Sequence, residues 1–88
     1  MRIKEGYLIN KLGDGFVVVT VGQASSDFNG MIRLNGTGAF LWQCILDGAD
    51  TREKLVGKMM DRYTGLDEAT AREDLDTFLE GIAIALEE

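Results

Sequence analysis

The signals for strands and the signals for helices are segregated along this chain, and their order limits the folds that it can form. Before residue 35 the apolar residues alternate or run in short stretches bounded by glycine, which is typical of strands. After residue 35 they recur at spacings of three and four, which is typical of helices. The sequence therefore predicts strands first and helices second.

Three strands are predicted, at residues 7–12, 16–21 and 31–34. Gly13-Asp14-Gly15 separates the first two and is typical of a three-residue hairpin connection, because glycine adopts positive φ without steric cost. The stretch 16–21 is rich in valine and apolar on both faces, which favours a central strand. Residues 22–30 are predicted to form a loop, so the three strands form a meander.

Three helices are predicted after the strands, and each follows a residue that can accept a hydrogen bond from a free amide of the first turn. These N-cap residues are Asn35, Thr51 and Asp67. The first helix is predicted to end near residues 47–48 and the second at Gly65. The last helix is predicted to present a core face of Ala71, Leu75, Phe78, Leu79, Ile82 and Leu86. An apolar shoulder of Gly81, Ile84 and Ala85 is expected beside that face.

The predicted fold class is therefore α+β, with a three-stranded antiparallel meander followed by three helices that pack on one face of the sheet. Residues 1–88 are expected to form a single domain. No stretch approaches the roughly 18 apolar residues of a membrane span, and no apolar run of signal-peptide length opens the sequence. We expect a cytoplasmic protein without membrane contact.

The acidic residues gather at the C-terminal end, and this distribution argues against binding of nucleic acid. The net charge is −6, and residues 66–88 hold eight acidic groups against Arg72 alone. A surface that binds nucleic acid needs several Lys or Arg on one face to replace the counterions of phosphate. We therefore expect no nucleic-acid partner.

The residue types of common catalytic and metal sites are scarce. The chain has no His, and its single cysteine, Cys44, lies in an apolar helix without a base to activate it. Gly36-Thr37-Gly38 opens a helix as phosphate-binding loops do, but neither a third glycine nor a Walker lysine follows. We predict no catalytic residue, no metal ligand and no cofactor, and we expect that the protein is not an enzyme.

The strand at 31–34 is the last of the meander and is predicted to be an edge strand with unpaired backbone groups. If the last helix packs along the sheet, its apolar shoulder lies beside this edge. An extended peptide would gain backbone hydrogen bonds from the strand and side-chain burial from the helix. The sequence therefore favours a peptide-binding groove.

Residues 31–42 resemble the signature of the PqqD-like family, in which an apolar strand is followed by Leu-Asn, two further residues, Gly-Ala and a tryptophan. Leu34, Asn35, Gly38, Ala39 and Trp42 match that signature position by position. The order of strands and helices around the segment agrees with the family over nearly the whole chain.

The resemblance implies a fold like a winged helix-turn-helix and a role as a recognition element for ribosomally made, modified peptides. Such a protein holds the leader segment of a precursor peptide as a strand added to the third strand, against the third helix. It presents that peptide to a modifying enzyme, often a radical SAM enzyme. The implied peptide-binding residues are Met31, Ile32, Arg33 and Leu34 on the strand, and some of Asp74, Leu75, Phe78, Leu79 and Ile82 on the helix, with Phe28 of the 22–30 loop covering or extending the groove.

Two other functions are compatible with the same pattern. The last two helices are arranged as in a winged-helix DNA-binding protein, which the acidic last helix disfavours. The edge strand is also able to pair with that of a second copy, which would make the chain a dimerisation module. We therefore expect a monomer or a weak homodimer.

Overall fold

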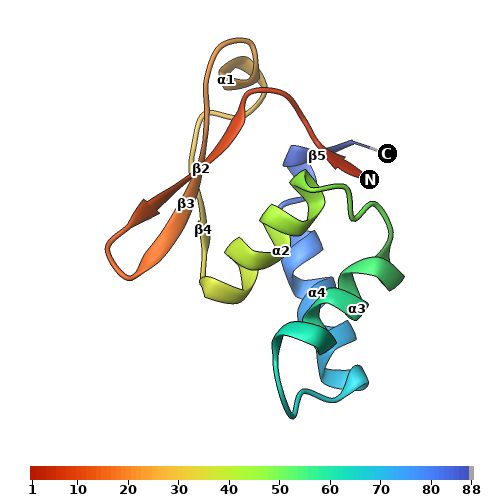
Figure 1. Ribbon diagram of the computed structural model, residues 1–88. Coiled ribbons are helices and arrows are strands. Elements are labelled where there is room, and N and C mark those ends of the chain that lie inside the picture. The colour runs from red at the N-terminus through yellow and green to blue at the C-terminus, as the bar shows by residue number, and fades with distance from the viewer. Residues whose placement is uncertain (88) are drawn as a thin grey trace.

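An antiparallel sheet of three strands forms one side of the molecule, as the computed structural model of residues 1–87 shows (Figure 1). Its strands are β2 (Tyr7–Leu12), β3 (Gly15–Thr20) and β4 (Ile32–Leu34), in the order β2-β3-β4. The predicted meander is therefore confirmed. Leu12 pairs with Gly15, so the hairpin loop is Gly13-Asp14 and is one residue shorter than predicted.

Three longer helices follow the sheet in the predicted order. They are α2 (Gly36–Leu46), α3 (Arg52–Arg62) and α4 (Glu68–Gly81). All three predicted N-caps are confirmed. The side chain of Asn35 accepts from the amide of Gly38 at 2.8 Å, that of Thr51 from Lys54 at 3.1 Å, and that of Asp67 from Thr70 at 2.8 Å.

The core lies between one face of the sheet and the three helices, which gather on the same side of it (Figure 1). Its largest fully buried side chains are Trp42, Leu41, Leu55, Met59, Leu75, Ile82 and Val18. These come from α2, α3, α4, β3 and the residue after α4. The fold class predicted from the sequence, α+β with helices following a three-stranded sheet, is confirmed.

The C-terminal part of the chain differs from the prediction. The helix α4 ends at Gly81, and a 3-10 turn η1 (Ala83–Ala85) and a short strand β5 (Leu86–Glu87) follow it. The strand β5 pairs with β1 (Arg2–Ile3), which the sequence did not predict. Ala85 is completely buried, so the expected apolar shoulder of α4 does not form. The reason is that the turn after Gly81 redirects the chain toward the N-terminal strand.

The loop at 22–30 also holds more structure than predicted. A single helical turn, α1 (Ala24–Asp27), lies within it, and Ala24 is buried in the core. Phe28 follows that turn and stacks on Tyr7 with 6.4 Å between the ring centroids. The loop therefore packs against the start of β2.

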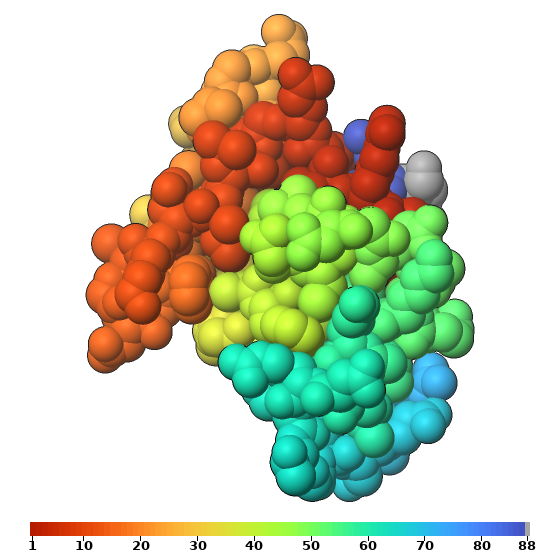
Figure 2. Space-filling model, in the orientation of Figure 1, coloured from red at the N-terminus to blue at the C-terminus, as the bar shows by residue number. Residues whose placement is uncertain are grey.

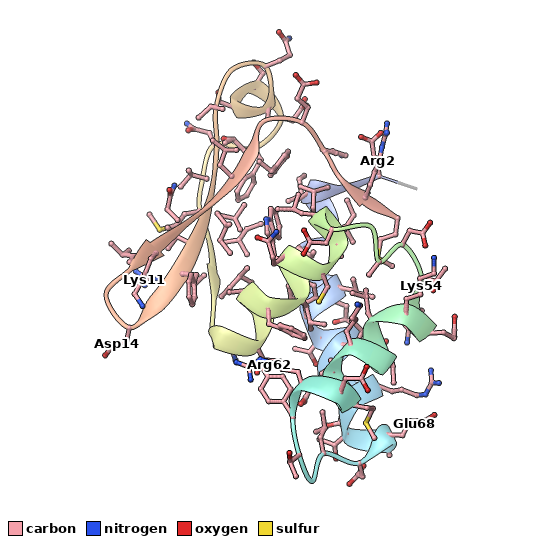
Figure 3. The ribbon with its side chains drawn as sticks, in the orientation of Figure 1. Arg2, Lys11, Asp14, Lys54, Arg62 and Glu68 are labelled. Carbon is pink, nitrogen blue, oxygen red and sulfur yellow. The ribbon has the colours of Figure 1, made fainter. Side chains whose placement is uncertain are left out.

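The β2–β3 hairpin extends beyond the helices as a wedge (Figure 2). Figure 3 shows Lys11 and Asp14 at its free end, on the opposite side of the view from Arg2 and Lys54. None of the helices described in residues 1–87 is long and apolar enough to cross a membrane.

The cap of α4 predicts how stability depends on pH. The hydrogen bond from the backbone amide of Thr70 holds the pKa of Asp67 below its ordinary value. The ionised side chain of Asp67 therefore stabilises the fold above a pH of about 4, and this contribution is lost as the pH falls below that value. We expect Asp67→Asn, which keeps a neutral cap, to lose less unfolding free energy than the wild type between pH 5 and pH 2, as measured by urea denaturation. Asp14→Asn removes the same charge at the hairpin tip and serves as the control. An equal change in both variants would contradict the assignment.

Candidate functional site

The strand β4 has a sheet neighbour on one side only. It pairs with β3 through Ile32, Arg33 and Leu34, and residues 1–87 place no strand along its other edge. An open edge presents backbone donors and acceptors to any extended chain that approaches it. The first part of the predicted groove, an unpaired third strand, is therefore present.

The register of the sheet identifies which backbone groups are free. Directly after β3, the amide of Val21 donates to the carbonyl of Gly6, the residue before β2, at 2.9 Å, so the backbone groups of Val21 face the β2 side. Residues of a central antiparallel strand alternate between its two neighbours, so Val17 also faces β2 and Val18 faces β4. Arg33 lies opposite Val17. Its amide and carbonyl therefore point away from β3, toward the open edge.

A cavity of about 420 Å³ lies beside this edge. It is bounded by β4, the first turns of α2 and the second half of α4. The lining residues are Ile32, Arg33, Leu34, Asn35, Thr37, Gly38, Leu41, Asp74, Thr77, Phe78 and Gly81. The open edge and the cavity together form a groove, which we call the β4–α4 groove.

Local sequence chemistry explains how the walls of this groove are held. Asn35 ends β4 and caps α2, so the helix begins directly after the strand. A Cβ atom on Gly38 would lie 3.3 Å from the side chain of Leu34, which shows how closely α2 approaches β4. Leu41 and Phe78 are buried and supply apolar surface from α2 and α4.

Glycine at position 81 keeps one end of the groove open. A Cβ atom on Gly81 would meet no heavy atom within 4 Å, although Gly81 lines the cavity. The backbone there is not in the left-handed region, so a larger residue is compatible with the helix. The space at Gly81 is therefore determined by the absent side chain and not by the backbone.

Two exposed charged residues border the groove, Asp74 on α4 and Arg33 on β4. By the alternation of the strand, the side chain of Arg33 emerges on the face of the sheet that is turned away from the helices, so Arg33 borders the groove through its backbone. Neither forms an ion pair with another residue in the range 1–87, whereas the neighbouring Asp76 pairs with Arg52 of α3. Both charges are therefore available to a ligand.

Of the peptide-binding residues proposed from the sequence, some line the groove and others lie in the core or outside the cavity. Those that line the groove are Ile32, Arg33, Leu34, Asp74 and Phe78. Leu75 and Ile82 are completely buried in the core, and Leu79 is half-buried against it. Met31 is exposed just before β4, and Phe28 stacks on Tyr7, so neither lines the cavity.

Several groove residues were not proposed from the sequence. On α4 these are Thr77 and Gly81, and around the start of α2 they are Asn35, Thr37, Gly38 and Leu41. Asp74, Thr77, Phe78 and Gly81 follow the spacing i, i+3, i+4, i+7 of one helix face. Asp74 and Phe78 of that stripe were proposed from the sequence, whereas Thr77 and Gly81 lack the large apolar side chain that would have indicated a groove position.

A second cavity, of about 530 Å³, lies between α2 and α3. Cys44 contributes to its wall together with Lys54, Lys58, Asp47 and Asp61. Burial raises the pKa of the Cys44 thiol, which makes it a weaker nucleophile at neutral pH.

Within residues 1–87, no three side chains of His, Cys, Asp or Glu are grouped so that they could hold a metal ion.

Comparison with known proteins gives two matches to the chain. A model of the family described as coenzyme PQQ synthesis protein D (PqqD) matches residues 15–83, which include both walls of the β4–α4 groove. Comparison with curated proteins finds no match.

A solved structure is also similar in fold. It is described as TbiB1 in complex with the TbiA(beta) leader peptide. The TM-score is 0.71, the sequence identity is 22%, and the similarity covers 94% of this chain and 88% of that one.

Proposed function

The chain belongs to the PqqD family, and we propose that it binds the leader segment of a ribosomally synthesised precursor peptide in the β4–α4 groove. The observation that carries the proposal is that the free backbone groups of Arg33 lie beside a cavity whose lining includes the apolar side chains of Leu41 and Phe78. The related fold of TbiB1, which is described in complex with a leader peptide, supports the same role.

Backbone pairing alone gives such a complex limited affinity. The strand β4 has three residues, and of these only Arg33 directs its amide and carbonyl outward. A net contribution of about 0.5 to 1.5 kcal/mol for each hydrogen bond is expected. Burial of one large apolar side chain contributes about 1.5 to 3 kcal/mol. We infer that the cavity, which reaches Leu41 and Phe78, supplies most of the affinity and the selection among peptides.

The role that we propose for the groove residues follows from their positions. Arg33 pairs with the peptide backbone, Ile32 and Leu34 form the strand wall, and Phe78 with Gly81 forms the helix wall. Asp74 favours a peptide that carries Lys or Arg near the groove. Binding and presentation require no reactive group, so we propose that the chain itself performs no chemical step.

The peptide must then reach an enzyme that modifies it. We propose that this partner is a radical SAM enzyme and that the chain acts in the cytoplasm as a single domain.

We do not favour DNA binding, because α4 carries Glu73, Asp74, Asp76 and Glu80 on its surface. Pairing of two β4 edges would leave the adjacent cavity without a function, so we also favour a peptide over a second copy.

Filling the cavity tests the site. Gly81→Met projects a side chain into the open space, and we expect it to reduce the affinity for a leader peptide at least tenfold, a change of about 1.4 kcal/mol. The unfolding free energy is not expected to fall, because methionine has a higher helix propensity than glycine. Isothermal titration with synthetic leader segments of candidate precursor peptides measures the effect.

Gly57→Met is the matched control for this experiment. Gly57 is also an exposed helical glycine with open space around it, but it lies at the second cavity on α3. The affinity of the Gly57→Met variant for the peptide should equal that of the wild type. Full affinity of Gly81→Met would count against a peptide in the β4–α4 groove.

Strand addition is tested at Arg33. Arg33→Pro removes the outward amide at an edge position where proline is tolerated, whereas Arg33→Ala removes only the side chain. We expect the proline variant to bind about 3- to 10-fold more weakly than the alanine variant, in line with the loss of one hydrogen bond. Fluorescence anisotropy with the same labelled leader segment measures both affinities. Equal affinities would exclude a peptide strand paired at this residue.

The charge of Asp74 predicts a dependence on salt. If the leader carries Lys or Arg, its affinity should fall as NaCl is raised from 50 to 500 mM, because exposed charges are screened. Asp74→Asn should reduce this dependence and weaken binding at low salt about two- to five-fold. Glu73→Gln changes the neighbouring residue, which does not line the groove, and should leave the affinity unchanged. If the affinity of the wild type does not vary with the NaCl concentration, Asp74 does not attract a basic leader.

A further inference from the structure

The sheet presents an apolar face that is turned away from the helices. Seven large hydrophobic side chains are exposed among residues 1–87, and four of them share this face by the alternation of the strands. They are Leu8 at 49% exposure, Leu12 at 52%, Val21 at 48% and Met31 at 53%. In Figure 1 the longer helices α2, α3 and α4 lie on the opposite side of the sheet. We call this surface the outer face.

The centre of the outer face is Val17. It lies opposite Asn10 on β2 and Arg33 on β4, so these three side chains form a row across the sheet. Val17 is 7% exposed, yet it is not a member of the hydrophobic core cluster, whereas its neighbour Val18 is. Val17 is therefore shielded by neighbours on the outer face itself. Val19, opposite Leu8, extends the apolar surface.

The charge of the outer face differs from that of the whole chain. Arg33 is the one ionised side chain among its members, although the net charge of the chain is −6. Lys11 belongs to the inner face, where it lies 5.5 Å from the ring centroid of Phe16. The largest apolar patch on the surface of a monomeric protein is often a contact surface.

A second copy of the chain fits this face poorly. The three strands, of six, six and three residues, cover only about 240 Å², at about 3.3 Å per residue and about 4.8 Å between strands. A stable complex buries about 800 Å² on each partner. Two copies packed face to face would also cover Arg33 at the edge of each face, without an acidic residue on the face to pair with it.

We propose that the outer face is a docking surface for a different protein, which presents apolar side chains and a carboxylate that pairs with Arg33. The small area implies a transient complex. A further part of the inference rests on the proposed function: a peptide added at the edge of β4 would form a fourth strand, and every second side chain of that strand would emerge on the outer face. The partner would then contact this chain and its bound peptide together.

The docking surface is tested first with a small molecule of the same chemistry, 3-phenylpropionate, against its uncharged analogue 3-phenylpropanamide. In amide-detected NMR titrations of the whole chain, we expect shifts at Leu8, Val17, Val19 and Arg33. The shifts should be at least twofold larger for the acid, and Arg33→Gln should remove that difference. No shifts on the outer face, or equal shifts for acid and amide, would overturn the proposal.

Two variants separate this surface from the groove. Leu8→Ser combined with Val19→Ser should abolish the shifts on the outer face and leave any shifts at Leu41 and Phe78 intact. Gly81→Met should do the reverse. If the groove does not bind the probe, only the shifts at Leu41 and Phe78 are absent. If the outer face does not bind it, only the shifts at Leu8 and Val19 are absent. Thermal unfolding verifies that each variant is folded.

Sedimentation velocity and vesicle binding test the other occupants. The chain should remain monomeric from 10 to 500 μM, and it should not sediment with vesicles of phosphatidylcholine and phosphatidylglycerol. A dimer that the Leu8→Ser and Val19→Ser changes dissociate would make the outer face an interface between copies. Vesicle binding lost in the same variant would make it a lipid-binding surface. Either result would overturn the proposal.

Discussion

The direct passage from strand β4 into helix α2 determines the arrangement of the whole functional region. Asn35 ends the strand and caps the helix, and the absence of a side chain at Gly38 lets the helix approach Leu34 closely. With α2 held against this end of the sheet, the edge of β4 has no strand of the chain to pair with in residues 1–87, and α4 packs across from it. The groove is the space left between these three elements.

Much of the fold could be predicted because its signals are local. The three helix caps and the three strands of the sheet depend on residues within a few positions of each other, and the structure confirms them. The pairing of Ile3 with Leu86 depends on residues at opposite ends of the chain, and their side chains give no sign of it. The end of α4 was missed for the same reason, since residues after Gly81 continue an apolar pattern that a helix would also show.

The candidate site was predictable on the strand side and less so on the helix side. An edge strand is evident from its place at the end of a meander, and Ile32, Arg33 and Leu34 line the groove. Successive side chains of α4 are rotated by about 100° about the helix axis. A small error in the predicted orientation of the helix therefore exchanges core and groove residues. Leu75 is completely buried, whereas its neighbour Asp74 lines the groove. The sequence alone does not say which side of α4 faces the sheet.

The pairing of β1 with β5 has a consequence for how this fold can be attached to larger assemblies. Arg2 lies opposite Glu87, and both ends of the described chain meet at one corner, away from the β2–β3 hairpin (Figure 1). A flexible tether could therefore join either end without crossing the sheet. Genetic fusion to a reporter or to an enzyme should work equally well in both orders, and circularly permuted versions should need only a short linker to close the old termini.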